Sequence, residues 1–145
     1  MRVTDTLAFA AGRWRLERVL ADHRSGLEGR FTGQALLTGP DLPGDPLSYR
    51  ETGELRFGLH AGPATRSLRY QGLPDGTVDV LFADGHLFYR LDLRSGHCTA
   101  VHPCRADQYE ITYLVLGDDV MEERWRVRGP DKDYDATATL IRCHH

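Results

Sequence analysis

The chain has 145 residues and a formal net charge of −3, with 41% hydrophobic and 27% charged residues. This length suits one domain with a core large enough to be stable without disulfides or metals. The composition lacks the basic surface typical of nucleic-acid binding, and no apolar run approaches the roughly 20 residues that span a bilayer. We therefore expect one domain over residues 1–145, with neither nucleic acid nor a membrane as partner.

The ends of the chain and its thiols point to the compartment. The N-terminal segment MRVTDTLAFAAGRW lacks the apolar region of about 7–15 residues of a secretory signal. Three cysteines are an odd number without the spacing of a disulfide framework, which favours reduced thiols. Together these features predict a cytoplasmic protein.

One short helix is predicted at the start. Over residues 4–11, Thr4 or Asp5 can cap a helix, and Leu7 and Phe9 can cover one end of a core. After Gly12 the chain changes to short segments in which every second residue is apolar, separated by Gly, Pro and Asp turns. Strands are predicted over 14–20, 27–37, 47–57, 64–71, 77–83, 86–93, 97–102, 108–116, 120–128 and 134–143. Turns are predicted at 74–76, 84–85, 95–96 and 117–119.

Nine or ten strands with almost no helix indicate a β-sandwich or a β-barrel. The short connections favour an up-and-down order, and closure of the sheet removes its exposed edges. We predict an all-β fold: a closed antiparallel up-and-down barrel with a short N-terminal helix.

The two ends of the predicted barrel carry a known pattern. Gly12-Arg13-Trp14 opens the first strand and Arg142 ends the last one, which resembles the lipocalin superfamily signature. The resemblance implies an arginine packed over the indole, worth about 0.5–2 kcal/mol. The alternative is that Trp14 is an ordinary core residue.

A wider resemblance covers most of the chain. HPCRADQY at 102–109 and WRVRGPDKDY at 125–134 resemble two motifs of a family of uncharacterised bacterial lipocalin-like proteins, His-x-Cys-x-x-Asp-x-Tyr and Trp-x-Val-x-Gly-Pro-x-Lys-Asp-Tyr. LSYRETGEL, RSLRY and FADGHLFY follow the expected order. One position departs, because Tyr89 stands where the family often has histidine. The resemblance implies a lipocalin-like barrel and no particular activity.

The inward-facing positions of this barrel carry charges. Alternate residues of each strand point inward, and a lumen without a ligand is filled by apolar side chains. Arg18, Glu51 and Arg66 each share a strand face with an aromatic residue. Burying them requires pairing, water or a ligand.

Two interpretations of these charges remain open. The first is a cavity lined by Tyr and Trp over an Arg/Glu/His floor, suited to a polar or anionic aromatic ligand. The second is a closed Arg–Glu pair that ties strands together, or a register that places the charges outside. The residues predicted to line a ligand site are Arg18, Tyr49, Glu51, Arg66, Tyr70, Tyr89, His102, Cys104, Tyr109, Tyr113 and Trp125.

The charge balance suggests a further expectation. Arg18, Glu51 and Arg66 are expected on three neighbouring strands lining one lumen. One carboxylate can neutralise only one of the two arginines. We expect the surplus positive charge to point at a ligand anion, or to be stabilised by tyrosine hydroxyls.

The sequence gives less support to a metal site or to a nucleophilic cysteine. His97, His102, Cys104 and Asp107 are possible metal ligands, but His97 and His102 point in opposite directions on a continuous strand, so neither a metal nor a cofactor is expected. Cys104 beside His102 is a possible nucleophile, although a free cysteine is more often a buried small residue. The register around Pro103 is left open.

Three function classes are compatible with the sequence. The favoured one is a small-molecule-binding barrel, a monomer or homodimer. The alternative is an isomerase, cyclase or hydratase in which His102 acts as general acid or base with Tyr109, Glu51 or Asp107 as partner. The third is a barrel used only for protein contacts. In the turn GPDKDY, Lys132 is either a gate at the barrel mouth or part of a tight turn.

Overall fold

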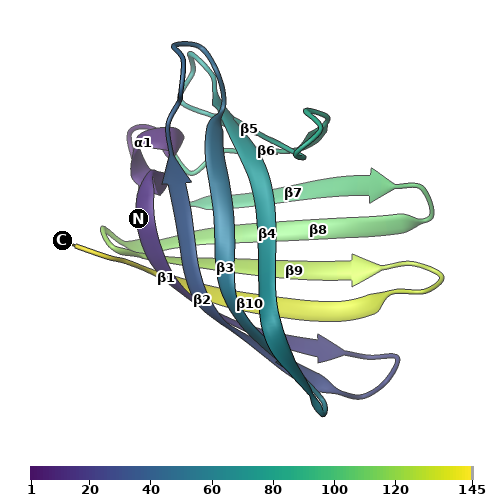
Figure 1. Ribbon diagram of the computed structural model, residues 1–145. Coiled ribbons are helices and arrows are strands. Elements are labelled where there is room, and N and C mark those ends of the chain that lie inside the picture. The colour runs from purple at the N-terminus through teal and green to yellow at the C-terminus, as the bar shows by residue number, and fades with distance from the viewer. Residues whose placement is uncertain (145) are drawn as a thin grey trace.

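The structure, a computed structural model, describes residues 1–144, and His145 lies outside the described part. One short helix precedes ten antiparallel strands in a nearly closed barrel (Figure 1). The elements are α1 (Thr6–Ala10), β1 (Gly12–Asp22), β2 (Glu28–Thr38), β3 (Leu47–Phe57), β4 (His60–Gly72), β5 (Val78–Leu81), β6 (Leu87–Leu91), β7 (His97–Cys104), β8 (Asp107–Gly117), β9 (Val120–Arg128) and β10 (Asp133–Arg142). The predicted all-β fold with a short N-terminal helix is confirmed.

The helix is shorter than predicted because its cap is Asp5. The Asp5 carboxylate accepts a hydrogen bond from the backbone N–H of Ala8 at 2.9 Å, which is the usual N-cap interaction. Among the described residues, no helix is long and apolar enough to cross a bilayer.

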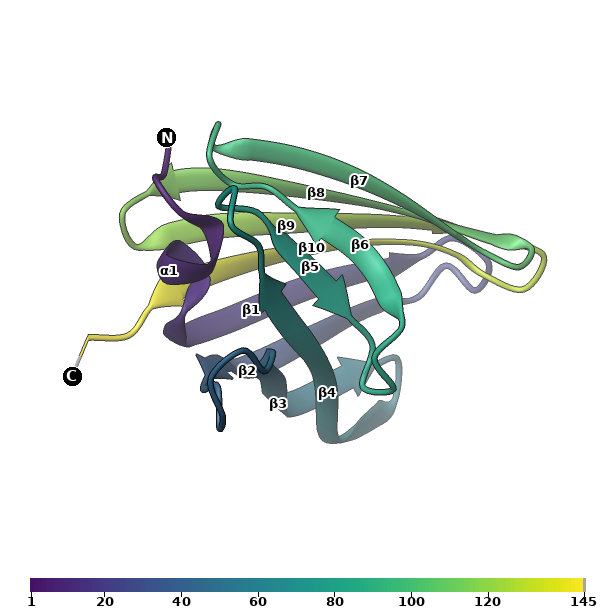
Figure 2. The ribbon, with the colours of Figure 1, turned by 90° about the horizontal axis from the view of Figure 1, so that it is seen from above.

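The strands form one sheet in the order β6-β5-β4-β3-β2-β1-β10-β9-β8-β7. Consecutive strands pair with each other, except β6 with β7, and β1 also pairs with β10, so the two ends of the chain meet in the middle of the sheet. The edges are therefore β6 and β7, which lie near each other in Figure 2. No ladder joins them among the described residues. We call this boundary the seam.

The two ends of the barrel differ. At one end β4, which has 13 residues, pairs with β5 only over Arg69–Gly72. Beyond that point β4 and β7 diverge (Figure 1). The hairpins β1–β2, β3–β4, β7–β8 and β9–β10 surround this open end. The helix α1 lies at the opposite, closed end.

The closed end is built around Trp14. The Arg142 guanidinium lies 4.3 Å from the centre of its indole ring and donates to the carbonyls of Phe9 at 2.8 Å and Ala11 at 3.2 Å. The indole N–H donates to Ala10 O at 2.9 Å. The arrangement expected from Gly-x-Trp and the final arginine is confirmed, and it fixes α1 across this end.

Candidate ligand-binding site

Three charged residues meet inside the barrel. Arg18 on β1 donates through Nη1 and Nη2 to the two carboxylate oxygens of Glu51 on β3, at 2.9 and 3.1 Å. Arg66 on β4 donates through Nη2 to Glu51 Oε2 at 2.8 Å. Their common lumen is as predicted. Their strands are not all neighbours, however, because β2 lies between β1 and β3 and the long Arg18 side chain spans it.

A fourth charge, Glu123 on β9, was missed by the sequence analysis. Its carboxylate lies 3.5 Å from Arg18 Nη2 and 3.6 Å from Arg66 Nη2, and it accepts the indole N–H of Trp125. The expectation of a surplus positive charge is therefore wrong, because two carboxylates balance two guanidinium groups. The signal was present in the sequence, since Glu123 shares its strand face with Trp125.

These neighbours stabilise the charged forms of the network. Burial raises the pKa of Glu51, but Arg66, Arg18 and the Tyr49 hydroxyl together outweigh it and lower that pKa from 4.5 to about 2. Burial lowers the pKa of Arg18 and Arg66, yet the adjacent carboxylates hold both pKa values above the ordinary value of an arginine. The three groups therefore stay ionised at neutral pH, and the closed Arg–Glu arrangement that the sequence left open is present.

Four tyrosines fill the closed half beneath the network. Tyr49 and Tyr70 stack with ring centres 5.0 Å apart, Tyr49 donates to Glu51 at 2.6 Å, and the hydroxyls of Tyr89 and Tyr113 are 2.7 Å apart. Burial raises the pKa of all four phenols. The remaining cavity has a volume of about 10 Å³, room for about one water. These tyrosines were expected on the wall of a ligand cavity; instead they are packed core.

Aromatic side chains line the seam at the level of Trp125. Phe88 on β6 lies 5.1 Å from the ring centre of His102, 5.9 Å from Tyr109 and 5.6 Å from Trp125. Phe88 was not predicted at the site. A β-bulge in the β5–β6 ladder places both Phe88 and Tyr89 inside, whereas strict alternation would bury only one of them.

The open question about β7 is resolved in favour of a continuous strand. Residues 97–104 pair with β8 without a register shift, and His102 lies opposite Tyr109. Pro103 is tolerated because β7 is an edge strand. His102 is half-buried and Cys104 is exposed at the rim. Within residues 1–144, the His102 imidazole makes no hydrogen bond to a carboxylate or a thiol, and of its predicted partners Tyr109 lies beside it, with ring centres 6.3 Å apart.

Metal ligands do not converge in the described part of the chain. His97 is exposed on the outer face, and no group of three or more His, Cys, Asp or Glu residues could hold an ion. Cys98, Cys104 and Cys143 are free thiols.

A hollow of about 470 Å³ opens at the mouth of the barrel. Its lining consists of Leu20, Asp22, Arg24, Ser25, Phe57, Asp131, Lys132, Asp133 and Tyr134. Lys132 donates to the Tyr109 hydroxyl at 2.9 Å, an interaction that raises the lysine pKa. The turn itself is closed by Gly129 N donating to Lys132 O at 2.7 Å. The tight turn is confirmed, and a gating role for Lys132 stays a prediction.

Solvent reaches the network unequally. The side chains of Glu51 and Glu123 are each 2% exposed, whereas Arg18 is 12% and Arg66 29% exposed. Because packed tyrosines seal the closed half, this exposure faces the open half. A molecule entering the open half would therefore meet guanidinium groups first.

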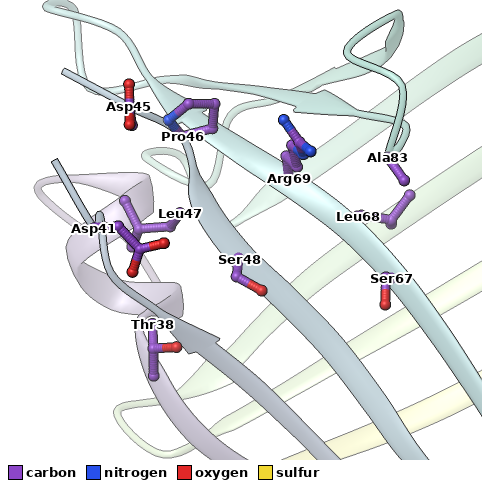
Figure 3. A pocket seen from close by; sticks show the side chains of 10 residues that line it. All are labelled: Thr38, Asp41, Asp45, Pro46, Leu47, Ser48, Ser67, Leu68, Arg69 and Ala83. Carbon is purple, nitrogen blue, oxygen red and sulfur yellow. The ribbon is translucent and has the colours of Figure 1, made fainter.

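A second hollow, of about 510 Å³, lies outside the barrel over β3 and β4 (Figure 3). Ser48, Ser67 and Arg69 project into it from outward-facing strand positions, and Asp41 and Asp45 border it from the β2–β3 loop. The sheet separates it from the network, and its charged side chains are exposed.

Comparison with known proteins places the chain in a family. A family model described as a family of unknown function (DUF6314) matches residues 10–142. The chain belongs to the DUF6314 family. No curated protein matches it.

Two solved structures resemble this DUF6314 barrel. The S-type phycobiliprotein lyase CPES from Guillardia theta aligns with a TM-score of 0.68 at 11% identity, covering 100% of this chain and 94% of that one. A de novo designed fluorescence-activating β-barrel aligns with a TM-score of 0.50 at 15% identity, covering 97% of this chain and 100% of that one. At these identities the likeness shows the fold alone.

Proposed function

We propose that this barrel binds a small, partly polar or anionic molecule in its open half. The observation that carries the proposal is the unequal exposure of the buried network, in which the arginines face the opening and the glutamates do not. Guanidinium donors at the base of a low-dielectric recess interact more strongly with a polar or anionic group than the same donors do on the exposed surface.

The surroundings of the network also suit a ligand. The mouth hollow, about 470 Å³, lies within the usual range of about 300–1,000 Å³ for ligand pockets. Its lining combines three apolar or aromatic side chains, Leu20, Phe57 and Tyr134, with six polar or charged residues. The fold similarity to a phycobiliprotein lyase and to a designed fluorescence-activating barrel is in keeping with small-molecule binding.

The test introduces a large side chain on the inner face of β1, where it fills the hollow, and uses the same change on the outer face of β1 as the control. Leu20 lines the hollow, whereas its neighbour Val19 is 40% exposed on the outer face. We expect Leu20→Trp to abolish saturable binding of anilinonaphthalene sulfonate, measured by its fluorescence, and Val19→Trp to leave binding unchanged. Equal binding by both variants, or no saturable binding by the unmodified protein, would contradict the proposal.

The catalytic alternative receives less support. His102 packs edge-on against Phe82 and Phe88, with ring centres 5.9 and 5.1 Å away. Among the described residues no polar side chain hydrogen-bonds the imidazole, so nothing there fixes its orientation or tautomer. We therefore propose binding rather than catalysis by His102.

A further inference from the structure

The two arginines of the network contact its carboxylates through different numbers of nitrogens. Arg18 uses two nitrogens on Glu51 and one of them also approaches Glu123. Arg66 uses only Nη2, which contacts both carboxylates. Its Nε is buried and has no hydrogen-bond partner among the described residues. Buried donors of this kind are normally satisfied, so Arg66 has an unused donor inside the barrel.

Both carboxylates keep hydrogen-bond partners if Arg66 turns to bind another group. Glu51 retains both Arg18 nitrogens and the Tyr49 hydroxyl. Glu123 retains the Trp125 indole and the contact with Arg18. If Arg18 turned to a ligand instead, the only cation left to the two carboxylates among the described residues would be Arg66, which reaches them through a single nitrogen. Arg66 can therefore engage a ligand at a smaller cost to the network than Arg18 can.

The surroundings of Arg66 restrict the ligand that it fits. Its guanidinium carbon lies 4.7 Å from the centre of the Trp125 ring, and Trp125 is in edge-to-face contact with Phe88 and Tyr109. One face of the guanidinium plane is thus held by an aromatic ring, while Nη1 and the buried Nε make no hydrogen bond among the described residues, so Arg66 keeps donors for an oxyanion.

We propose that Arg66 is the residue that selects the ligand, and that the ligand is an aromatic molecule carrying a single carboxylate. This inference rests on the proposed binding function and names its ligand class. A neutral amide offers a carbonyl acceptor but no charge, so it binds the guanidinium more weakly than a carboxylate does. A dianion would place a second negative charge close to Glu51 and Glu123, which already neutralise the two arginines. A single carboxylate on a planar scaffold accepts from the guanidinium with less of that repulsion.

The experiment compares three probes on one scaffold: naphthoate, naphthamide and naphthyl phosphate, the last mostly dianionic at about pH 8. Binding is measured by quenching of tryptophan fluorescence and by calorimetry. We expect naphthoate to bind about tenfold or more tightly than naphthamide, as for a hydrogen bond to a charged group, and more tightly than the phosphate.

Variants of β4 assign the selectivity to Arg66. Arg66→Gln should bring naphthoate and naphthamide to similar affinities, and Arg66→Lys should restore part of the preference, since it keeps the charge without the planar fork. Arg69→Gln, on the exposed outer face of β4, should behave like the unmodified protein. Circular dichroism and thermal melting of each variant establish that it is folded.

The outcomes separate the two proposals. Equal affinity of the unmodified protein for naphthoate and naphthamide, or a preference that survives Arg66→Gln in the folded protein, would overturn the selection by Arg66 while leaving the binding function standing. Tighter binding of naphthyl phosphate would overturn the single-carboxylate assignment. Absence of saturable binding by all three probes would contradict both proposals.

Discussion

At the scale of single residues, Glu51 holds three strands together. It accepts hydrogen bonds from Arg18, Tyr49 and Arg66, so it links β1, β3 and β4 while being 2% exposed. Replacing a buried ion pair by apolar residues is often tolerated, but removing one partner leaves an uncompensated charge. The glutamates thus act as structural groups, while the guanidinium groups face the opening.

Glu51 should make the free energy of unfolding depend on pH in the acid range. Its pKa falls from 4.5 to about 2 on folding, so its contribution is fully present above pH 4.5 and is lost as the pH falls from 4.5 towards 2. The shift corresponds to about 3 kcal/mol. We expect Glu51→Gln to lower the free energy of unfolding by about 3–5 kcal/mol at neutral pH and to flatten its fall in this acid window.

Urea denaturation across that pH range measures both effects. Glu54→Gln is the matched control, because Glu54 lies on the same strand but is 54% exposed and pairs with Arg56 on the surface. An unchanged acid dependence in Glu51→Gln would contradict the assignment to Glu51.

A feature of the site could be predicted from the sequence only where it depends on residues close together in one strand. Strand-face alternation placed Arg18, Glu51 and Arg66 in one lumen correctly. It could not give the depth of a residue along the barrel axis, so tyrosines of the packed half were assigned to a cavity wall. Nor could it show that β9 brings Glu123 to the arginines, because that contact depends on how the whole sheet curves.

At the scale of elements, the β5–β6 hairpin is the least supported part of the sheet. Its ladders comprise Arg69–Gly72 with Val78–Leu81 on one side and Val78–Leu81 with Leu87–Leu91 inside the hairpin. Across the seam it is held by packing of Phe82 and Phe88 against His102, and the described residues form no ladder between it and β7.

Hydrogen exchange should therefore be faster in β5 and β6 than in β1 and β10, which pair from Trp14 to Asp22. Phe88→Ala should weaken the protection of the hairpin amides by about 3–5 kcal/mol, the usual cost of truncating a buried phenylalanine. Leu87→Ala, at a side chain 52% exposed on the same strand, should leave it unchanged. Uniform protection over the whole sheet would contradict this view of the seam.

The strands themselves were predictable because their signals are local. Period-two alternation and Gly, Pro and Asp turns located all ten strands and the helix. The open boundary between β6 and β7 could not be predicted in this way. It follows from the bulge near Val80 and Leu81 and the short β5–β6 hairpin rather than from any repeating pattern.

At the scale of the whole molecule, stability and the proposed binding function belong to different halves of the barrel. The closed half holds the Trp14–Arg142 contact and the tyrosine layer, and the open half holds the recess above the network. Packed interiors tolerate little change in volume. Substitutions at the rim should therefore change ligand affinity with little effect on folding, whereas substitutions below Glu51 should do the opposite.

The meeting of β1 and β10 in the middle of the sheet has a consequence for chain order. The sheet runs spatially from β7 through β10, then β1, to β6, so a circular permutant that starts at Gly96 and ends at Ser95 would form every ladder between consecutive strands. The end of β10 lies against α1, since Arg142 donates to the carbonyls of Phe9 and Ala11, so a flexible glycine linker can join the C-terminal end of the chain to residue 1. Because the β1–β10 ladder, which joins the two ends of the natural chain, becomes a local one, less loop-closure entropy opposes the folding transition state. The permutant should refold faster in stopped-flow experiments at similar stability, and slower refolding would show that β1–β10 pairing does not limit the rate.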